Sequence, residues 1–378
     1  MAGADGRILT THAGSLPRPN ELADTIWARI DGQEIDAARL ESMIDSAVGE
    51  VVAKQHEAGI DVISDGEMSK TGFSTYINDR FSGFAGRSEF QADDVAPFPN
   101  LAMKLFATDS MAHLIFANCV GPVEVADRDA VHRDIARLKK AMGDADPSTA
   151  FMGTISPGQI AFNYPDQHYG SHEKYLAACA EALAHEYNAI VDAGLNLQVD
   201  SPDMAMAAHS RSVGSSVGDW HHHLPLAVEA LNGALAGIPP ERVRFHVCWG
   251  NIGSPHHFDV PLAEIIDQVL KVNAGTIYVE GANPRHQHEW RVFRDTRLPD
   301  DKKLILGVID VKTNYIEHPR VVADRLVQVG KLIGKDRLLA GTDCGFDTFI
   351  RWSLVDPDVA WLKLKSLSEG AEIASGEL

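Results

Sequence analysis

The chain has 378 residues, of which 45% are hydrophobic and 23% are charged, an ordinary composition for a globular protein with a large core. A disordered chain, a fibre or a coiled coil is therefore excluded as the main architecture. The formal net charge of −19 argues against nucleic acid or an anionic membrane surface as the main partner, because both are polyanionic.

Eight short, almost continuously apolar runs recur along the chain, and we predict that each is a buried β-strand. They cover residues 7–15, 60–67, 148–156, 195–201, 242–248, 275–281, 303–310 and 337–344. Stretches with helical periodicity lie between them, for example residues 37–59, 172–194, 261–275 and 318–334. Eight strands that alternate with helices predict an α/β fold, a (β/α)8 TIM barrel that occupies residues 1–378 as a single domain.

The interval between the second and third runs is much longer than the others. Residues 68–147 contain several Pro and Gly residues, which interrupt regular elements. We therefore expect an insertion after the second strand, built around a small hairpin, that covers the barrel mouth as a lid.

The location of the protein is predicted from what the sequence lacks. It has no basic segment followed by an apolar stretch near the N-terminus, and no run of about 18 apolar residues. Its four cysteines are too few for a disulfide-stapled scaffold. We expect a cytoplasmic protein with no membrane partner, and a homo-oligomer is compatible with the sequence.

Catalytic residues of a TIM barrel lie at the carboxyl ends of its strands, and every predicted strand here ends in polar or metal-binding side chains. In chain order these are His12 and Ser15, Asp65 and Glu67, Ser156, Asp200 and Ser201, His246 and Cys248, Glu280, Asp310 and Lys312, and Asp343 and Cys344. A barrel with a purely structural role would not need such side chains at each strand end.

One subset of these residues has the chemistry of a metal site. His246 and Cys248 are two positions apart, so on a strand they point to the same side. Glu280 ends the next strand and Cys344 follows the last one. Two thiolates and an imidazole favour zinc over magnesium or calcium. The His-x-Cys pair alone is a weak signal, since such cysteines are commonly core residues.

Taken together, the motifs from HAGSLPRP to TDCGF resemble the C-terminal catalytic barrel of cobalamin-independent methionine synthases and their shorter, stand-alone relatives. The zinc ligands of that family are an H-x-C pair, a Glu that ends the next strand and the Cys of a DCG motif. The resemblance implies a Zn²⁺ cofactor held by His246, Cys248, Glu280 and Cys344. It also implies a transferase that activates a substrate thiol as a zinc thiolate and alkylates it.

Three further motifs, GSLP, DGE and QVDSP, resemble the family's amino-acid-binding segments. By this resemblance Ser15 and the backbone of Ala13 hold the substrate carboxylate, while Glu67 and Asp200 bind its ammonium group. We assign His12, which belongs to the same strand end as Ser15, to the substrate site as well. The partners are then a small-molecule thiol and an alkyl donor.

The sequence departs from the family at the other half of the chemistry. Lys312, in a DVKT segment that begins with Asp310, stands where the family has its general acid His. We assign Lys312 and Asp310 to catalysis, with anion binding as the other role for the lysine. Asn163, which we assign to the substrate site, stands where the family has a Trp that stacks on folate, and Ser201 replaces an acidic residue. The identity of the alkyl donor is therefore open.

Several functions remain compatible with these residues. The first is methyl transfer to homocysteine or a similar thiol. The alternatives are an epoxide–coenzyme M transferase, whose family HAGSLPR and DVK also resemble, a C–S or C–O lyase or demethylase that uses the same chemistry, and a zinc barrel without turnover. Clustered histidines at residues 221–223 and 256–257 are interpreted as loop residues near the mouth, with substrate contact or a second metal site as alternatives.

Overall fold

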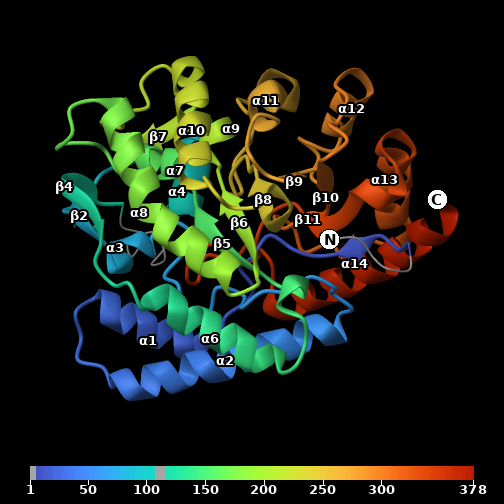
Figure 1. The fold of residues 1–378 in the computed structure, drawn as a ribbon, viewed down its shortest axis with the longest axis horizontal. Coiled ribbons are helices and arrows are strands. Elements are labelled where there is room, and N and C mark those ends of the chain that lie inside the picture. The colour runs from blue at the N-terminus through green and yellow to red at the C-terminus, as the bar shows by residue number, and fades with distance from the viewer. Residues whose placement is uncertain (1–5, 107–115) are drawn as a thin grey trace.

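The structure, a computed structural model, describes residues 6–106 and 116–378. Its centre is a curled seven-stranded sheet with the order β1-β11-β10-β9-β8-β6-β5, in which neighbouring strands run parallel (Figure 1). In chain order the strands are β1 (Leu9–Thr10), β5 (Phe151–Ile155), β6 (Asn196–Asp200), β8 (Val243–His246), β9 (Thr276–Val279), β10 (Lys303–Ile309) and β11 (Leu338–Thr342). Each lies inside one of the predicted apolar runs, so these strand predictions are confirmed.

The second predicted strand, residues 60–67, is reduced to a single bridge. Ile63 pairs with Ala150 in parallel, outside any ladder. The chain then turns away, because Gly66 and Glu67 adopt φ angles of +64° and +60°, which a β-strand cannot accommodate. The structure therefore shows an α/β fold with a curled parallel sheet, and its closure into an eight-stranded barrel stays a prediction.

Helices surround this sheet (Figure 1). The longer ones are α1 (Asn20–Ile30), α2 (Ala37–Glu57), α6 (Ala130–Met142), α8 (His172–Asp192), α10 (Trp220–Ala234), α11 (Leu262–Val269), α13 (Pro319–Ile333) and α14 (Pro357–Glu377). Asp36 and Ser171 accept hydrogen bonds from the first turns of α2 and α8, and Pro319 begins α13. These are common start signals, so the predicted helices are confirmed, although α11 ends earlier than expected.

Shorter elements connect the sheet to its helices. They are the α-helical turns α3 (Ile77–Arg80), α4 (Pro99–Phe106), α7 (Pro157–Asn163), α9 (Asp203–Met206) and α12 (Val292–Asp295), and the 3-10 turns η1 (Pro147–Thr149), η2 (Pro240–Arg242), η3 (Glu289–Arg291) and η4 (Lys335–Arg337). Of these, α7 follows β5 directly, so it begins at the same edge of the sheet at which the parallel strands end.

The predicted insertion contains regular elements of its own. Strand β2 (Phe81–Ala85) pairs antiparallel with β4 (Asn118–Val125), and β3 (Phe90–Ala92) pairs antiparallel with β7 (Ser210–Ser212). The β2–β4 pair resembles the expected hairpin, but β3 and α4 lie between its strands in the chain. Helix α6 returns to the outer layer, where it packs beside α2 (Figure 1). Residues 107–115 of the predicted lid lie outside the described residues.

The sheet positions the functional residues because its core strands are buried along their whole length. Every residue of β5, β6, β8, β9 and β11 is buried, as expected for strands that are covered on both faces. Their carboxyl ends meet at one edge, so the residues that follow them gather there. Within the described ranges, no helix combines the length and the apolar character that crossing a membrane requires.

Candidate active site

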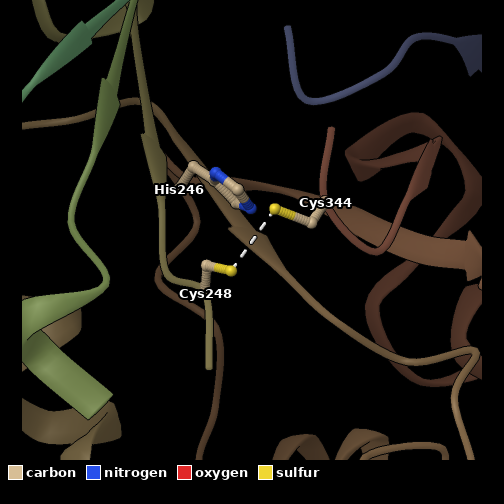
Figure 2. A group of neighbouring side chains, drawn as sticks. All are labelled: His246, Cys248 and Cys344. Carbon is tan, nitrogen blue, oxygen red and sulfur yellow. Dashed lines mark hydrogen bonds between the residues drawn. The ribbon is translucent and has the colours of Figure 1, made fainter. Parts of the chain in front are cut away.

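Three predicted metal ligands converge at this edge of the sheet. His246 ends β8, Cys248 follows two residues later, and Cys344 follows β11, so the group joins segments almost a hundred residues apart. Their side chains point toward one another (Figure 2), and their ligand atoms all lie within 4.8 Å of one another. The two sulfur atoms are 3.4 Å apart. All three residues are buried, so the site is shielded from bulk water.

The hydrogen bonds of His246 test whether a metal fits. Its Nδ1 lies 2.7 Å from Asp200 Oδ1, the carboxylate–imidazole pairing that commonly orients metal-binding histidines. Its Nε2 is buried and has no hydrogen-bond partner among the described residues, which is costly for a polar atom unless something else satisfies it. An imidazole nitrogen and two sulfurs form a donor set suited to zinc, so these residues fit the ion.

The charges of this group are coupled. Burial opposes the protonated form of His246, but the Asp200 carboxylate outweighs it and raises the pKa of the imidazole. Between the thiols, Cys248 donates its hydrogen to Cys344; this raises the pKa of Cys248 and lowers that of Cys344. When the two thiols lose their first proton, the negative charge therefore lies on Cys344.

Glu280, the fourth predicted ligand, lies beside this group but is engaged elsewhere. Its Oε2 pairs with Lys312 Nζ at 3.1 Å and accepts a hydrogen bond from Asn283 Nδ2 at 2.7 Å, while its Oε1 accepts one from the Trp249 N–H at 2.8 Å. Burial alone would raise its pKa, but the charges of Lys312 and His286 prevail and lower the pKa of Glu280 to about 2. Glu280 is therefore ionised at neutral pH.

Lys312 and Asp310, the predicted catalytic residues, are both engaged by neighbouring groups of the protein. Although burial opposes the charge of Lys312, Glu280 dominates and raises the pKa of the ammonium above its ordinary value. Burial therefore does not tune Lys312 downward, as a general acid of neutral pH would need. Asp310 accepts hydrogen bonds from the Lys312 backbone N–H at 3.0 Å and from Thr313 Oγ1 at 2.8 Å, so it shapes the turn that carries the lysine.

A cavity adjoins the metal ligands and contains most of the predicted substrate residues. Its lining includes Ser15, Glu67, Asn163 and Asp200 together with His246, Cys248 and Cys344. By contrast, His12, Glu280, Asp310 and Lys312 are absent from the described lining. The structure thus brings seven of the predicted site residues to one cavity, whereas four are not part of its described lining.

Glu67 and Asp200 converge in this cavity. A Cβ built on Gly153 would lie 3.1 Å from Glu67 Oε1 and 3.3 Å from Asp200 Oδ2. The Glu67 Oε2 atom is buried with no hydrogen-bond partner among the described residues. Burial, reinforced by Asp200 and opposed by Lys70, raises the pKa of Glu67 to about 7. Two neighbouring carboxylates of this kind favour a cationic group between them.

His12 does not join this cavity. Its Nε2 lies 2.7 Å from Gln55 Oε1, and its Nδ1 accepts a hydrogen bond from the Gly14 N–H at 3.1 Å. Burial lowers its pKa to about 4, so the ring is neutral. Both ring nitrogens are thus used in bracing the loop after β1. Asn163, by comparison, lines the cavity, and its Nδ2 has no hydrogen-bond partner in the part of the chain that the structure describes.

Sequence reasoning gave Asp343 no role, yet its carboxylate organises the loop after β9. It accepts hydrogen bonds from the backbone N–H groups of Gly281, Ala282 and Asn283 at 2.8–2.9 Å, and from Asn283 Nδ2 at 2.7 Å. Since Asn283 also donates to Glu280, Asp343 positions the fourth predicted ligand. Its place beside Cys344 in the TDCG segment was the only available signal.

Of the clustered histidines, residues 221–223 lie in helix α10 and not in a loop, whereas His256 joins Asp259 and His286 in a second buried group. Asp259 Oδ2 lies 2.8 Å from both His256 Nδ1 and His286 Nε2, and the three side chains are near enough to hold an ion. The His286 ring packs on the Trp249 ring with the centroids 4.5 Å apart, and the backbone N–H of Trp249 donates to Glu280 Oε1. Through Trp249, this group therefore supports the loop that carries Cys248.

Comparison with known proteins identifies the family. The model described as "Cobalamin-independent synthase, Catalytic domain" matches residues 8–95 and 160–360. The chain belongs to this family. A 2-hydroxypropyl-CoM lyase from Xanthobacter autotrophicus is 26% identical to it, covering 100% of this chain and 98% of that protein. A methionine synthase from Thermococcus kodakarensis is also 26% identical, covering 98% and 94%.

The fold agrees with this assignment to the cobalamin-independent synthases. The structure of a B12-independent methionine synthase from Shewanella sp. W3-18-1, in complex with selenomethionine, matches with a TM-score of 0.74, 24% identity and 98% coverage of both chains. The match to the family model confirms the predicted family, which is a family of transferase enzymes of the methionine synthase type.

Proposed function

We propose that this chain is a zinc-dependent transferase that alkylates a small amino thiol, homocysteine or a close analogue. The observation that carries this proposal is the buried His246 Nε2, unpartnered among the described residues, beside two cysteine sulfurs in a cavity that also holds two convergent carboxylates. The first group suits a thiol-binding metal, and the second suits an ammonium group.

Each half of this arrangement has a separate task. Zinc held by His246, Cys248 and Cys344, with Glu280 as fourth ligand, would lower the pKa of a substrate thiol so that it reacts as the thiolate. Asp200 fixes the ring of His246 through Nδ1. The Trp249 N–H and Asn283 hold the Glu280 carboxylate at the side of the site.

The cavity lining favours one kind of thiol. Glu67 and Asp200 together would bind the ammonium of an amino thiol, with Ser15 near its carboxylate. Of the described residues that line the cavity, none is a lysine or an arginine, so the lining offers no cationic side chain to pair with a sulfonate. This favours homocysteine-like thiols over coenzyme M as the acceptor.

The insertion and the cellular location fit the same proposal. Phe73, Phe90 and Phe116, all within residues 68–147, line the cavity, so we propose that this segment acts as its lid. All four cysteines are free. A reducing compartment such as the cytoplasm would keep Cys248 and Cys344 from forming a disulfide.

Metal content tests the proposal first. The purified protein is expected to contain one zinc per chain, and the Cys248→Ala variant should lose it. Cys179→Ala is the matched control, because Cys179 is equally buried but lies in α8, away from the site. Full zinc content in Cys248→Ala would overturn the assignment.

Thiol binding tests the second half. In the cobalt-substituted protein, titration with homocysteine should produce a sulfur-to-cobalt charge-transfer band at lower concentration than coenzyme M does. A Glu67→Gln variant should weaken the response to homocysteine but leave that to a thiol without an amino group unchanged. A stronger response to coenzyme M would replace the proposed acceptor.

A further inference from the structure

The cavity has a second half that the proposed thiol site does not use. Besides Phe106, six aromatic residues line it and contact one another: Phe73, Phe90, Phe116, Phe162, Phe349 and Trp352. We call this set the aromatic wall. Its rings form one connected series, with ring centroids 5.4–6.2 Å apart for the pairs 73–349, 349–116, 116–90, 90–162 and 349–352. The wall therefore presents a continuous π surface inside the same cavity as Cys248 and Cys344.

The aromatic wall keeps surface free for a ligand. Phe116 and Phe162 are buried, whereas Phe73, Phe90, Phe349 and Trp352 are only half-buried. Partly uncovered aromatic side chains at the mouth of a cavity gain contact area when a ligand packs against them. The alkyl donor must approach the thiol from within this cavity, so the aromatic wall is where its body would lie.

The charge around the aromatic wall restricts that donor. The described lining carries the carboxylates Glu67 and Asp200 and the cysteine pair, and it contains no lysine or arginine. Once Glu67 and Asp200 hold the ammonium of the thiol and the cysteines hold zinc, this lining still offers an anionic donor no lysine or arginine to pair with, whereas a cationic donor needs none. Aromatic faces add to this preference, because their quadrupole attracts cations and is used to recognise quaternary ammonium groups.

Building on the proposed function, we propose that the alkyl donor is an onium compound, a sulfonium or a quaternary ammonium, whose positive centre packs against the aromatic wall. The thiolate sulfur attacks one methyl carbon of the donor and forms a new C–S bond. The bond from that carbon to the positive sulfur or nitrogen breaks, and its electron pair stays on the leaving atom. The donor departs as a neutral thioether or tertiary amine.

This reaction matches the groups that face the cavity. The charges −1 and +1 cancel, and neither a proton nor a redox partner is required. An ether donor would leave as an oxyanion and would need a proton donor at its oxygen. Lys312, the sequence-based candidate for that role, is paired with Glu280 and does not line the cavity. An onium donor makes such a group unnecessary.

Binding of an isosteric pair tests the inference without depending on turnover. Choline and 3,3-dimethylbutan-1-ol have nearly the same shape and differ in the positive charge. Calorimetric titration of the intact protein, zinc-loaded and zinc-free, should show choline binding about tenfold more tightly, since a desolvated cation–π contact is worth about that factor. Equal affinity, or tighter binding of the uncharged alcohol, would overturn the onium assignment.

Variants locate the effect on the aromatic wall. Trp352→Leu should reduce the choline preference, whereas Trp361→Leu should not, because Trp361 lies in α14 beside Lys54 and outside the described lining. A preference that survives unchanged in Trp352→Leu and in Phe349→Leu would contradict the role of the aromatic wall.

Turnover separates this inference from the proposed function. With homocysteine as acceptor, trimethylsulfonium should be demethylated and release dimethyl sulfide, while anisole, a neutral aromatic methyl ether, should react more slowly. Faster reaction of anisole would overturn the onium donor in favour of a neutral aromatic one. If homocysteine still produced the cobalt charge-transfer band, the proposed function would stand in that case.

Discussion

The two halves of the cavity are built in different ways. His246, Cys248 and Cys344, which we call the ligand floor, lie at the ends of parallel strands or two residues beyond them. The Asp200 carboxylate orients His246, the Gly250 N–H donates to Cys248, and the Cys248 thiol donates to Cys344. The aromatic wall comes from a β-edge, a short helix and loops, and its members contact one another mainly through their rings, with one backbone hydrogen bond from Trp352 N–H to the Phe349 carbonyl. Reacting atoms need fixed positions, which strand ends supply, whereas a donor pocket can change its shape through loops.

The largest expected effect concerns the ligand floor. Cys344→Ala removes one sulfur of the candidate site, so zinc content and alkyl transfer should both fall at least a hundredfold, beyond the range of about 10–100-fold seen when only an outer partner of a metal ligand is lost. Elemental analysis and an assay with homocysteine check this. Cys119→Ala, a buried cysteine outside the site, should retain both. Alkyl transfer that persists without zinc would contradict the proposed role of the ligand floor in the reaction.

The next effect concerns the residue that orients the floor. In Asp200→Asn the carboxylate that pairs with His246 Nδ1 becomes an amide, so zinc affinity should fall about 10–100-fold. Competition with a chelator measures this. Asp203→Asn, which perturbs a buried carboxylate paired with His223 instead, should leave zinc affinity close to that of the wild type. Equal losses in both variants would indicate a general structural effect.

The pH dependence of thiol binding tests Glu67. Because burial raises the pKa of Glu67 to about 7, its carboxylate is mostly protonated below that pH and ionised above it. An ammonium group favours the ionised form, so the KM for homocysteine should fall by about tenfold as the pH rises through 7, in keeping with a hydrogen bond to a charged group. Glu67→Gln should abolish this dependence. A pH profile unchanged by the substitution would contradict the ammonium site.

The same shift predicts a change in stability. The pKa of Glu67 in the folded state, about 7, exceeds its ordinary value of 4.5, so the folded state binds the extra proton between these values. The contribution of Glu67 to the free energy of unfolding is therefore lost as the pH rises from 4.5 through 7. Thermal unfolding of ligand-free wild type and Glu67→Gln should diverge within this window, with Glu67→Gln less sensitive to pH.

The smallest effect concerns the aromatic wall. Phe349→Leu removes a ring that contacts three other members of the wall, so the KM for the donor should rise about two- to tenfold, the range expected for aromatic contacts. Zinc content and the KM for homocysteine should not change. A loss of zinc in this variant would show that wall and floor are coupled, rather than independent as their construction suggests.

The local patterns of the sequence were sufficient to predict most strands of the sheet and to select the candidate metal ligands. Buried parallel strands appear as apolar runs, and seven of the eight predicted runs contain strands of the sheet. Residues at the ends of such strands necessarily meet at one edge, which is why His246 and Cys344 could be placed together without knowing any contact.

Only the tertiary structure decided what each polar side chain faces. Lys312 pairs with Glu280 and Gln55 engages His12, and both pairs join residues more than thirty positions apart. The aromatic wall likewise unites rings from separate loops and elements. Periodicity in a sequence reports which face of an element is buried, but the partner found there depends on how distant segments pack, and no local pattern encodes that.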